Sequence, residues 1–281
     1  MARLQGLALI FLAVTSALVG TALACGYATC PKSYDTSKLQ LHIISHSHDD
    51  VGWLSTPDGY ADQDVNPLLS HVVAALLKNP HRKFVEVEMY YFKRWWQRQT
   101  KVVHDIVHQL VKSGQLAFAN GGWCINDEAS PLYNNIIDQM TLGIQFLRDT
   151  FGECAEPKLS WQIDPFGASR EQANLFAMMG FDGHVLNRGN GHLHGEFLWN
   201  ASRSHSIFTS RLHAHYSAPH GFNFEDRKCF LFKNNSFFTN FCCCCFPQVT
   251  TSPSKTNTRR QRRLWSSASD GTTIMAAAVT C

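Results

Sequence analysis

The sequence predicts an α/β fold built around a parallel sheet, and three observations support this. Short apolar stretches alternate with longer amphipathic stretches between residues 39 and 188. The amphipathic stretches are long enough to form the helical crossovers that parallel strands require. Polar and charged clusters directly follow the apolar stretches, which is where parallel folds bind their ligands.

The first predicted elements are a strand, a helix and a second strand. Residues 41–45 form a short apolar run typical of a buried strand. Residues 84–91 are rich in β-branched and aromatic side chains, which favours a strand there. Between them, apolar side chains recur at helical spacing and Pro80 ends the run: Val65, Leu68, Leu69, Val72, Val73, Leu76 and Leu77.

Two further helices and a strand follow along the chain. A second helical stripe occupies residues 102–111, and Gly114 ends it. Residues 116–119 are typical of a strand, and residues 136–151 of a helix that ends at Gly152. Glycine is common just after a helix because it adopts the left-handed conformation at little cost.

The last predicted elements are a strand, a helix and a strand. Residues 159–163 form an apolar strand. Ser169 and Gln172 have the spacing of a capping box, which would start a helix that ends before Gly180. Residues 183–186 give a fifth strand. The alternation of strands and helices implies right-handed crossovers.

The chain divides into three predicted segments. Residues 1–24 are typical of a secretory signal peptide, with an apolar run and a small-residue cleavage site at Ala22-Leu23-Ala24. An uncleaved membrane anchor is the alternative, because the run approaches the length of a bilayer span. We expect one α/β domain over residues 25–226. Residues 227–281 change character and predict a divergent tail without regular structure.

The composition limits the function classes. The formal net charge is only +3, from 25 Lys and Arg against 22 Asp and Glu, so nothing indicates nucleic-acid binding. A secreted chain would enter an oxidising compartment, where its cysteines can pair. Asn200 and Asn234 lie in glycosylation sequons, which such a compartment could use. With the signal peptide removed, we expect no stable membrane association.

The segment HSHDDVGW, residues 46–53, follows the first predicted strand. An imidazole and a carboxylate two residues apart at a strand end can turn toward one point and bind a cation such as zinc. A polar loop with unrelated histidines is the alternative.

Two more motifs follow predicted strands. In WQIDPFG, Asp164 ends a strand and Pro165 turns the chain, while the rings of Trp161 and Phe166 could stack on a sugar. The alternative is an Asp that only starts a turn, beside ordinary core aromatics. In FANGGWCINDEAS, residues 118–130, two acidic residues are adjacent. Adjacent side chains usually point apart, so we interpret this segment as a solvated loop.

Five segments together resemble glycoside hydrolase family 38: HSHDDVGW, FVEVEMYYFKRWW, FANGGWCINDEAS, DQMTLGIQFLRDTFG and LSWQIDPFGASREQANLFAMMGFDG. The similarity covers residues 25–188 and continues more weakly at 206–210 and 216–226. It implies a (β/α) barrel-like catalytic domain with a zinc ion held by a His, two Asp and a later His. His48, Asp50 and Asp164 match the first three ligands.

The resemblance also implies roles in sugar binding and catalysis. Asp164 matches the nucleophile, Trp53 and Phe166 match the aromatic walls of the mannose site, and Arg188 matches an active-site arginine. The implied protein is a zinc-dependent retaining α-mannosidase that hydrolyses terminal α-mannose of N-glycan-type oligosaccharides in the lysosomal lumen or outside the cell. Such a mannosidase forms a covalent sugar intermediate on one carboxylate.

Two parts of the family pattern do not appear in this chain. The general acid and the fourth zinc ligand lie farther along the chain in the family, so we expect the domain to be incomplete and its activity low. One alternative is a non-catalytic remnant that binds zinc or sugar without turnover. The other is a metal-dependent deacetylase or amidohydrolase, which also uses His and Asp at barrel strand ends.

Overall fold

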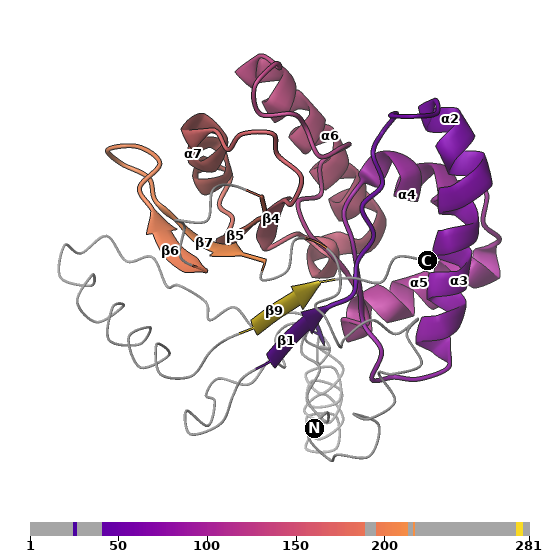
Figure 1. Cartoon of the computed structure of the whole chain (residues 1–281). Helices are drawn as coiled ribbons and strands as arrows, with labels where there is room; N and C mark the ends of the chain where they lie inside the picture. Colours follow the sequence, from indigo (N-terminus) through magenta and orange to yellow (C-terminus); the bar gives the residue numbers. More distant parts are fainter. Residues whose placement is uncertain (1–24, 27–40, 189–194, 213–215, 217–273, 278–281) are drawn as a thin grey trace, which may run out of the picture.

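The computed structural model describes residues 25–26, 41–188, 195–212, 216 and 274–277 (Figure 1). Its strands are β1 (Leu41–Ile44), β2 (Phe84–Glu86), β3 (Leu116–Phe118), β4 (Leu159–Gln162), β5 (Gly183–Leu186), β6 (Glu196–Trp199), β7 (Ile207–Arg211) and β9 (Ile274–Ala277). Its helices are α2 (Pro57–Tyr60), η2 (Ala61–Val65), α3 (Asn66–Leu77), α4 (Met89–Trp96), α5 (Lys101–Ser113), α6 (Tyr133–Phe151), η3 (Gly152–Ala155) and α7 (Arg170–Met178).

Parallel pairing dominates the strands, as the sequence predicts. The largest sheet has the order β4-β5-β7-β6, in which only β6 runs antiparallel to its neighbour. β2 pairs with β3 and β1 with β9, both in parallel. A parallel bridge between His46 and Val85 joins the end of β1 to β2, and the Asn120 N–H donates to the Leu159 carbonyl at 2.7 Å beside β4. The α/β class is therefore confirmed, whereas the closed barrel stays a prediction.

Most of the predicted elements lie within a few residues of their expected bounds, but the one at residues 84–91 is only partly right. Strand β2 ends at Glu86, and helix α4 starts at Met89. The N–H groups of Met89 and Tyr90, in the first turn of this helix, donate to the carbonyls of Gly122 and Trp123 in the segment after β3. Phe84 does lie in a strand, whereas Tyr91 lines the buried face of the helix.

The capping box at Ser169 is also only half correct. The Ser169 hydroxyl accepts the Glu171 N–H, as an N-cap should. Gln172, however, does not return to the Ser169 N–H. Its side-chain oxygen accepts from Asn126 at 2.9 Å, and the Ser169 N–H donates to Glu128.

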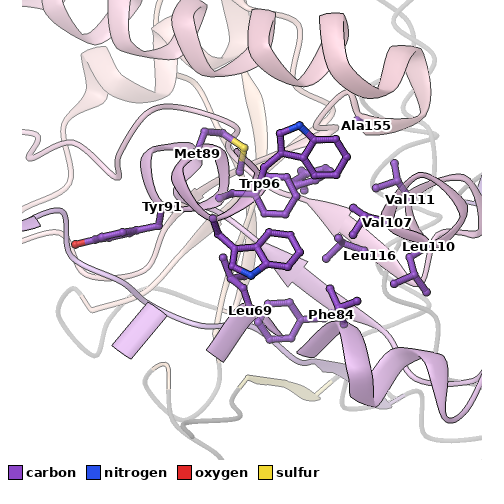
Figure 2. Packing of buried hydrophobic residues seen from close by; sticks show 14 of the residues in the cluster. Leu69, Phe84, Met89, Tyr91, Trp96, Val107, Leu110, Val111, Leu116 and Ala155 are labelled. Atoms are coloured by element: carbon purple, nitrogen blue, oxygen red, sulfur yellow. The ribbon is translucent and has the colours of Figure 1, made fainter. Parts of the chain in front are cut away.

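The main core lies between helices α3, α4 and α5 and the strands β2 and β3 (Figure 2). Phe92 and Trp95 of α4 are almost completely buried there, and Phe92 packs edge-on against Phe118 of β3. In Figure 1 these helices lie on the right of the view and the four-stranded sheet on the left. A large apolar contact of this kind fixes α4 firmly. The first turn of α4 contacts the segment Asp49–Asp50, so this segment is packed against a rigid helix.

Only part of the domain prediction falls on described residues. The predicted signal peptide and nearly all of the predicted tail lie outside them; the strand β9 within the tail was not predicted from the sequence.

A disulfide joins Cys25 to Cys154, across a sequence separation of 129 residues. Among the described helices, none has both the length and the apolar character that crossing a membrane requires.

Candidate functional site

The site forms where the carboxyl ends of several parallel strands meet. His48 and Asp50 follow β1, Asp164 follows β4, and Arg188 follows β5. The His48 Nε2 atom lies 3.2 Å from Asp50 Oδ1 and 3.6 Å from Asp164 Oδ2. The structure thus brings together, from segments more than a hundred residues apart, the three residues that the sequence predicts as metal ligands.

The spacing and chemistry of these three side chains fit a zinc ion. Their ligand atoms all lie within 4.8 Å of one another. Two ligands of a tetrahedral zinc at about 2.0–2.1 Å from the metal stand roughly 3.3 Å apart, close to the two observed distances. Both ring nitrogens of His48 are buried without a hydrogen-bond partner, although one is at ion-pair distance from two carboxylates. An imidazole whose buried nitrogens are left in this state fits a metal ligand.

Asp164 is held from its other side by Arg188. The Arg188 Nε donates a hydrogen bond to Asp164 Oδ1, and this bond raises the pKa of the guanidinium above its usual value. The Arg188 backbone has a φ of 57°, in the left-handed region that residues with side chains rarely adopt. Backbone strain of this kind concentrates at functional sites. The Asp164 side chain is mostly buried, with 15% exposed, so one edge stays accessible.

The two aromatic residues predicted for the sugar site are open to solvent. Trp53 is 73% exposed and Phe166 is 83% exposed. The Arg188 guanidinium lies over the Phe166 ring, 5.3 Å from its centroid, which ties that ring to the Asp164 pair. Trp161, by contrast, is buried and packs edge-on against His46, so it is a core residue.

Sequence reasoning missed Tyr216 as a member of this site. Its ring lies 5.1 Å from that of His48, and its hydroxyl bonds with the side chains of Asp164 and Arg188. Burial and then the Asp164 charge raise the pKa of Tyr216. The residue lies five positions beyond β7, a strand that the apolar pattern did not reveal, so no predicted strand pointed to it.

The acidic pair at residues 127 and 128 divides into two roles. Asp127 is exposed at the surface of its loop and accepts the Ser130 N–H at 3.0 Å, as the solvated-loop interpretation expects. Glu128 is half-buried and accepts the Ser169 N–H at the start of α7, and residues 118–122 are buried, so the solvated-loop interpretation is wrong for this part of the segment. Burial raises the pKa of Glu128 to about 7. Its contact is with the end of the loop that carries Asp164.

Comparisons with known proteins identify the family of the chain. Residues 38–274 match the model of the glycosyl hydrolases family 38 N-terminal domain. The chain is 46% identical over 219 residues to lysosomal alpha-mannosidase of Bos taurus and 44% identical over 232 residues to that of Homo sapiens. These alignments cover 70% and 75% of this chain but 22% of each relative, so the chain spans about a fifth of the relatives' length.

A solved structure shows the same fold. It is an alpha-mannosidase from Enterococcus faecalis, with a TM-score of 0.57 and 18% sequence identity. The overlap covers 64% of this chain and 21% of that one. At this identity the likeness supports the fold only.

Proposed function

Because this chain belongs to the glycosyl hydrolases family 38 by its N-terminal domain, we propose that it is a zinc-dependent retaining α-mannosidase with His48, Asp50 and Asp164 as zinc ligands and Asp164 as the nucleophile. The observation that carries the proposal is the convergence of His48, Asp50 and Asp164 at one strand edge, with Arg188 holding the far side of Asp164. The names of the relatives support α-mannose as the substrate. The parallel strand order with its site at the carboxyl ends supports a barrel as the complete fold.

In this proposal Asp164 is the nucleophile. Its carboxylate attacks the anomeric carbon of mannose while the glycosidic bond to the departing oxygen breaks, and an acid protonates that oxygen. Water then hydrolyses the mannosyl ester and restores the free carboxylate. Arg188 hydrogen-bonds Asp164 and fixes its orientation, and Tyr216 adds a second hydrogen-bonding contact. We assign the general acid to no residue of this chain.

His48, Asp50 and Asp164 would hold the zinc ion, which when bound acts as a Lewis acid toward sugar oxygens. The ring of Phe166 offers the sugar an apolar face beside the nucleophile, and Trp53 offers another on the loop after Asp50. These exposed rings would exclude water from one side of the bound sugar.

We further infer that the protein works on mannose-containing glycans in the lysosome or along the secretory pathway. The Cys25–Cys154 disulfide supports this, because structural disulfides persist in oxidising compartments. The names of the lysosomal relatives agree with it.

The test measures zinc and turnover on the same chain. Purified wild type should hold zinc and release the chromophore from an aryl α-mannoside at a low rate, since no residue of this chain is assigned as the general acid. His48→Ala should lose zinc, whereas His71→Ala, which changes an exposed histidine on α3, should not. Retention of configuration, followed by NMR of the first-formed sugar, checks the retaining mechanism.

The alternatives give different results in the same assay. A deacetylase would release acetate from acetylated sugars and leave the mannoside intact. A non-catalytic remnant would bind zinc or mannose with no product. Equal zinc content in wild type and His48→Ala would contradict the metal site.

A further inference from the structure

The backbone between the two candidate ligands His48 and Asp50 is held by the first turn of α4. The Tyr91 hydroxyl donates to the Asp50 carbonyl at 2.6 Å. One turn earlier, Glu88 Oε1 accepts the Asp49 N–H at 3.4 Å. The two contacts therefore bracket the Asp49–Asp50 segment from one side of one helix.

The Tyr91 contact completes the hydrogen bonding of the Asp50 carbonyl. The Gly52 N–H already donates to this oxygen at 2.8 Å, in a turn where Gly52 has a φ of 88°. A carbonyl oxygen accepts two hydrogen bonds, so Tyr91 takes the remaining position. Because the carbonyl direction fixes the peptide plane, it also restricts where the Asp50 side chain can point.

Helix α4 is a rigid support for these contacts. Glu88 and Tyr91 are each only 1% exposed. Farther along the helix, Phe92 and Trp95 are buried in the main core. Figure 2 shows Met89 and Trp96 of the same helix in this core. A ligand segment that is hydrogen-bonded to a fixed helix is held ready for the metal, so little ordering is needed on binding.

We propose that Tyr91, assisted by Glu88, is a positioning residue that sets the zinc affinity of the His48–Asp50–Asp164 site. It touches neither substrate nor metal and acts through the backbone of Asp50. The inference rests on the proposed function in that this site binds zinc. Outer contacts of this kind typically change metal affinity by about 10- to 100-fold when they are lost.

The chain supplies a closely matched control in the neighbouring tyrosine. Tyr90 lies on the same helix, but its hydroxyl donates to Asp58 on α2 at 3.0 Å, away from the ligand segment. Tyr91→Phe and Tyr90→Phe each remove one hydroxyl and keep the ring. The full chain of each variant is titrated with zinc alone, in competition with a chromophoric chelator. Hydrogen exchange of the peptide covering residues 46–54 is measured on the metal-free chains.

Tyr91→Phe should weaken zinc binding by at least about tenfold and speed exchange in residues 48–53, whereas Tyr90→Phe should change neither. Glu88→Gln, whose amide oxygen still accepts the Asp49 N–H, should bind zinc within about threefold of wild type. Glu88→Met has a similar volume but no acceptor, so it should bind more weakly. Melting of the metal-free chains identifies any variant that is simply unfolded.

Three outcomes would overturn the proposal. Equal zinc affinity of wild type and folded Tyr91→Phe overturns the positioning role alone and leaves the proposed function standing. Equal loss in Tyr91→Phe and Tyr90→Phe shows that the effect is not specific to the Asp50 carbonyl. A wild-type chain that takes up no zinc contradicts the metal site itself, and with it both the proposed function and this inference.

Discussion

Arg188 joins the two sides of the candidate site, because its guanidinium hydrogen-bonds Asp164 and lies over the ring of Phe166. One side chain thus orients the proposed nucleophile and one aromatic platform for the sugar. Its backbone holds a left-handed conformation, with a φ of 57°. Side chain and backbone therefore make separate contributions that substitutions can distinguish.

We expect Arg188→Ala and Arg188→Gly to lower kcat/KM equally, by roughly 10- to 150-fold, because a hydrogen bond to a charged group contributes about 1.5–3 kcal/mol. The free energy of unfolding of the glycine variant should be about 1 kcal/mol larger than that of the alanine variant, because glycine adopts positive φ without strain. Kinetics with an aryl α-mannoside check the loss in kcat/KM, and urea unfolding checks the difference in stability. Equal stabilities would mean that the backbone at this position carries no strain.

The sequence pattern predicts the segments that carry the metal candidates, because each follows an apolar strand, whereas the choice of residues within them rests on the family resemblance. The segments of His48 and Asp164 keep this pattern however far apart they lie in the chain. Tyr216 has no such signature, since strand β7 is recognisable only through its pairing with β5. Helix α4 was missed at Met89 because buried aromatic residues favour a strand in isolation, and only tertiary packing decides for a helix. Gln172 likewise found a tertiary partner in Asn126.

Removing the ring of Phe166 should weaken sugar binding and leave stability unchanged. Phe166 is 83% exposed, so Phe166→Ala loses little burial and should alter the free energy of unfolding by under about 0.5 kcal/mol. An aromatic contact of about 1 kcal/mol corresponds to roughly fivefold in affinity. Titration with a mannoside measures the affinity.

Leu132→Ala is the matched control for that loss, because Leu132 is 68% exposed but lies at the start of α6. It should change neither affinity nor stability. An equal loss of sugar binding in both variants would show that Phe166 has no specific part in the site.

Breaking the Cys25–Cys154 disulfide should destabilise the fold substantially. The bond closes a loop with a sequence separation of 129 residues, and removing such a bond from a secreted domain costs about 2–5 kcal/mol. Cys154→Ser should therefore unfold at lower urea, and adding Cys25→Ser should cause little further loss. Unfolding with and without a reducing agent measures the effect.

Cys124 provides the control for the disulfide. It is the free cysteine of the described residues, and burial raises the pKa of its thiol to about 11, so that it stays protonated and exchanges poorly. Cys124→Ser should respond to the reducing agent as wild type does. If reduction leaves the wild-type unfolding curve in place, the bond does not stabilise the chain.

The last prediction concerns the pH dependence that Glu128 gives to the loop carrying Asp164. Burial raises the pKa of Glu128 from an ordinary 4.5 to about 7 in the folded chain, against the opposing bond from the Ser169 N–H. Between these two values the folded chain therefore binds more protons than the unfolded chain. Stability from this group is fully present below about pH 4.5 and is lost as the pH rises through about 7. Glu128→Gln keeps an acceptor for Ser169 and cannot ionise, so the stability difference between wild type and variant should shift in favour of the variant from pH 5 to pH 8.

Asp127→Asn is the control, because hydrogen bonds from Ser130 lower the pKa of Asp127 and its titration falls below this window. Urea unfolding at closely spaced pH values measures all three chains, and parallel curves for wild type and Glu128→Gln would show that Glu128 does not titrate with folding in this range.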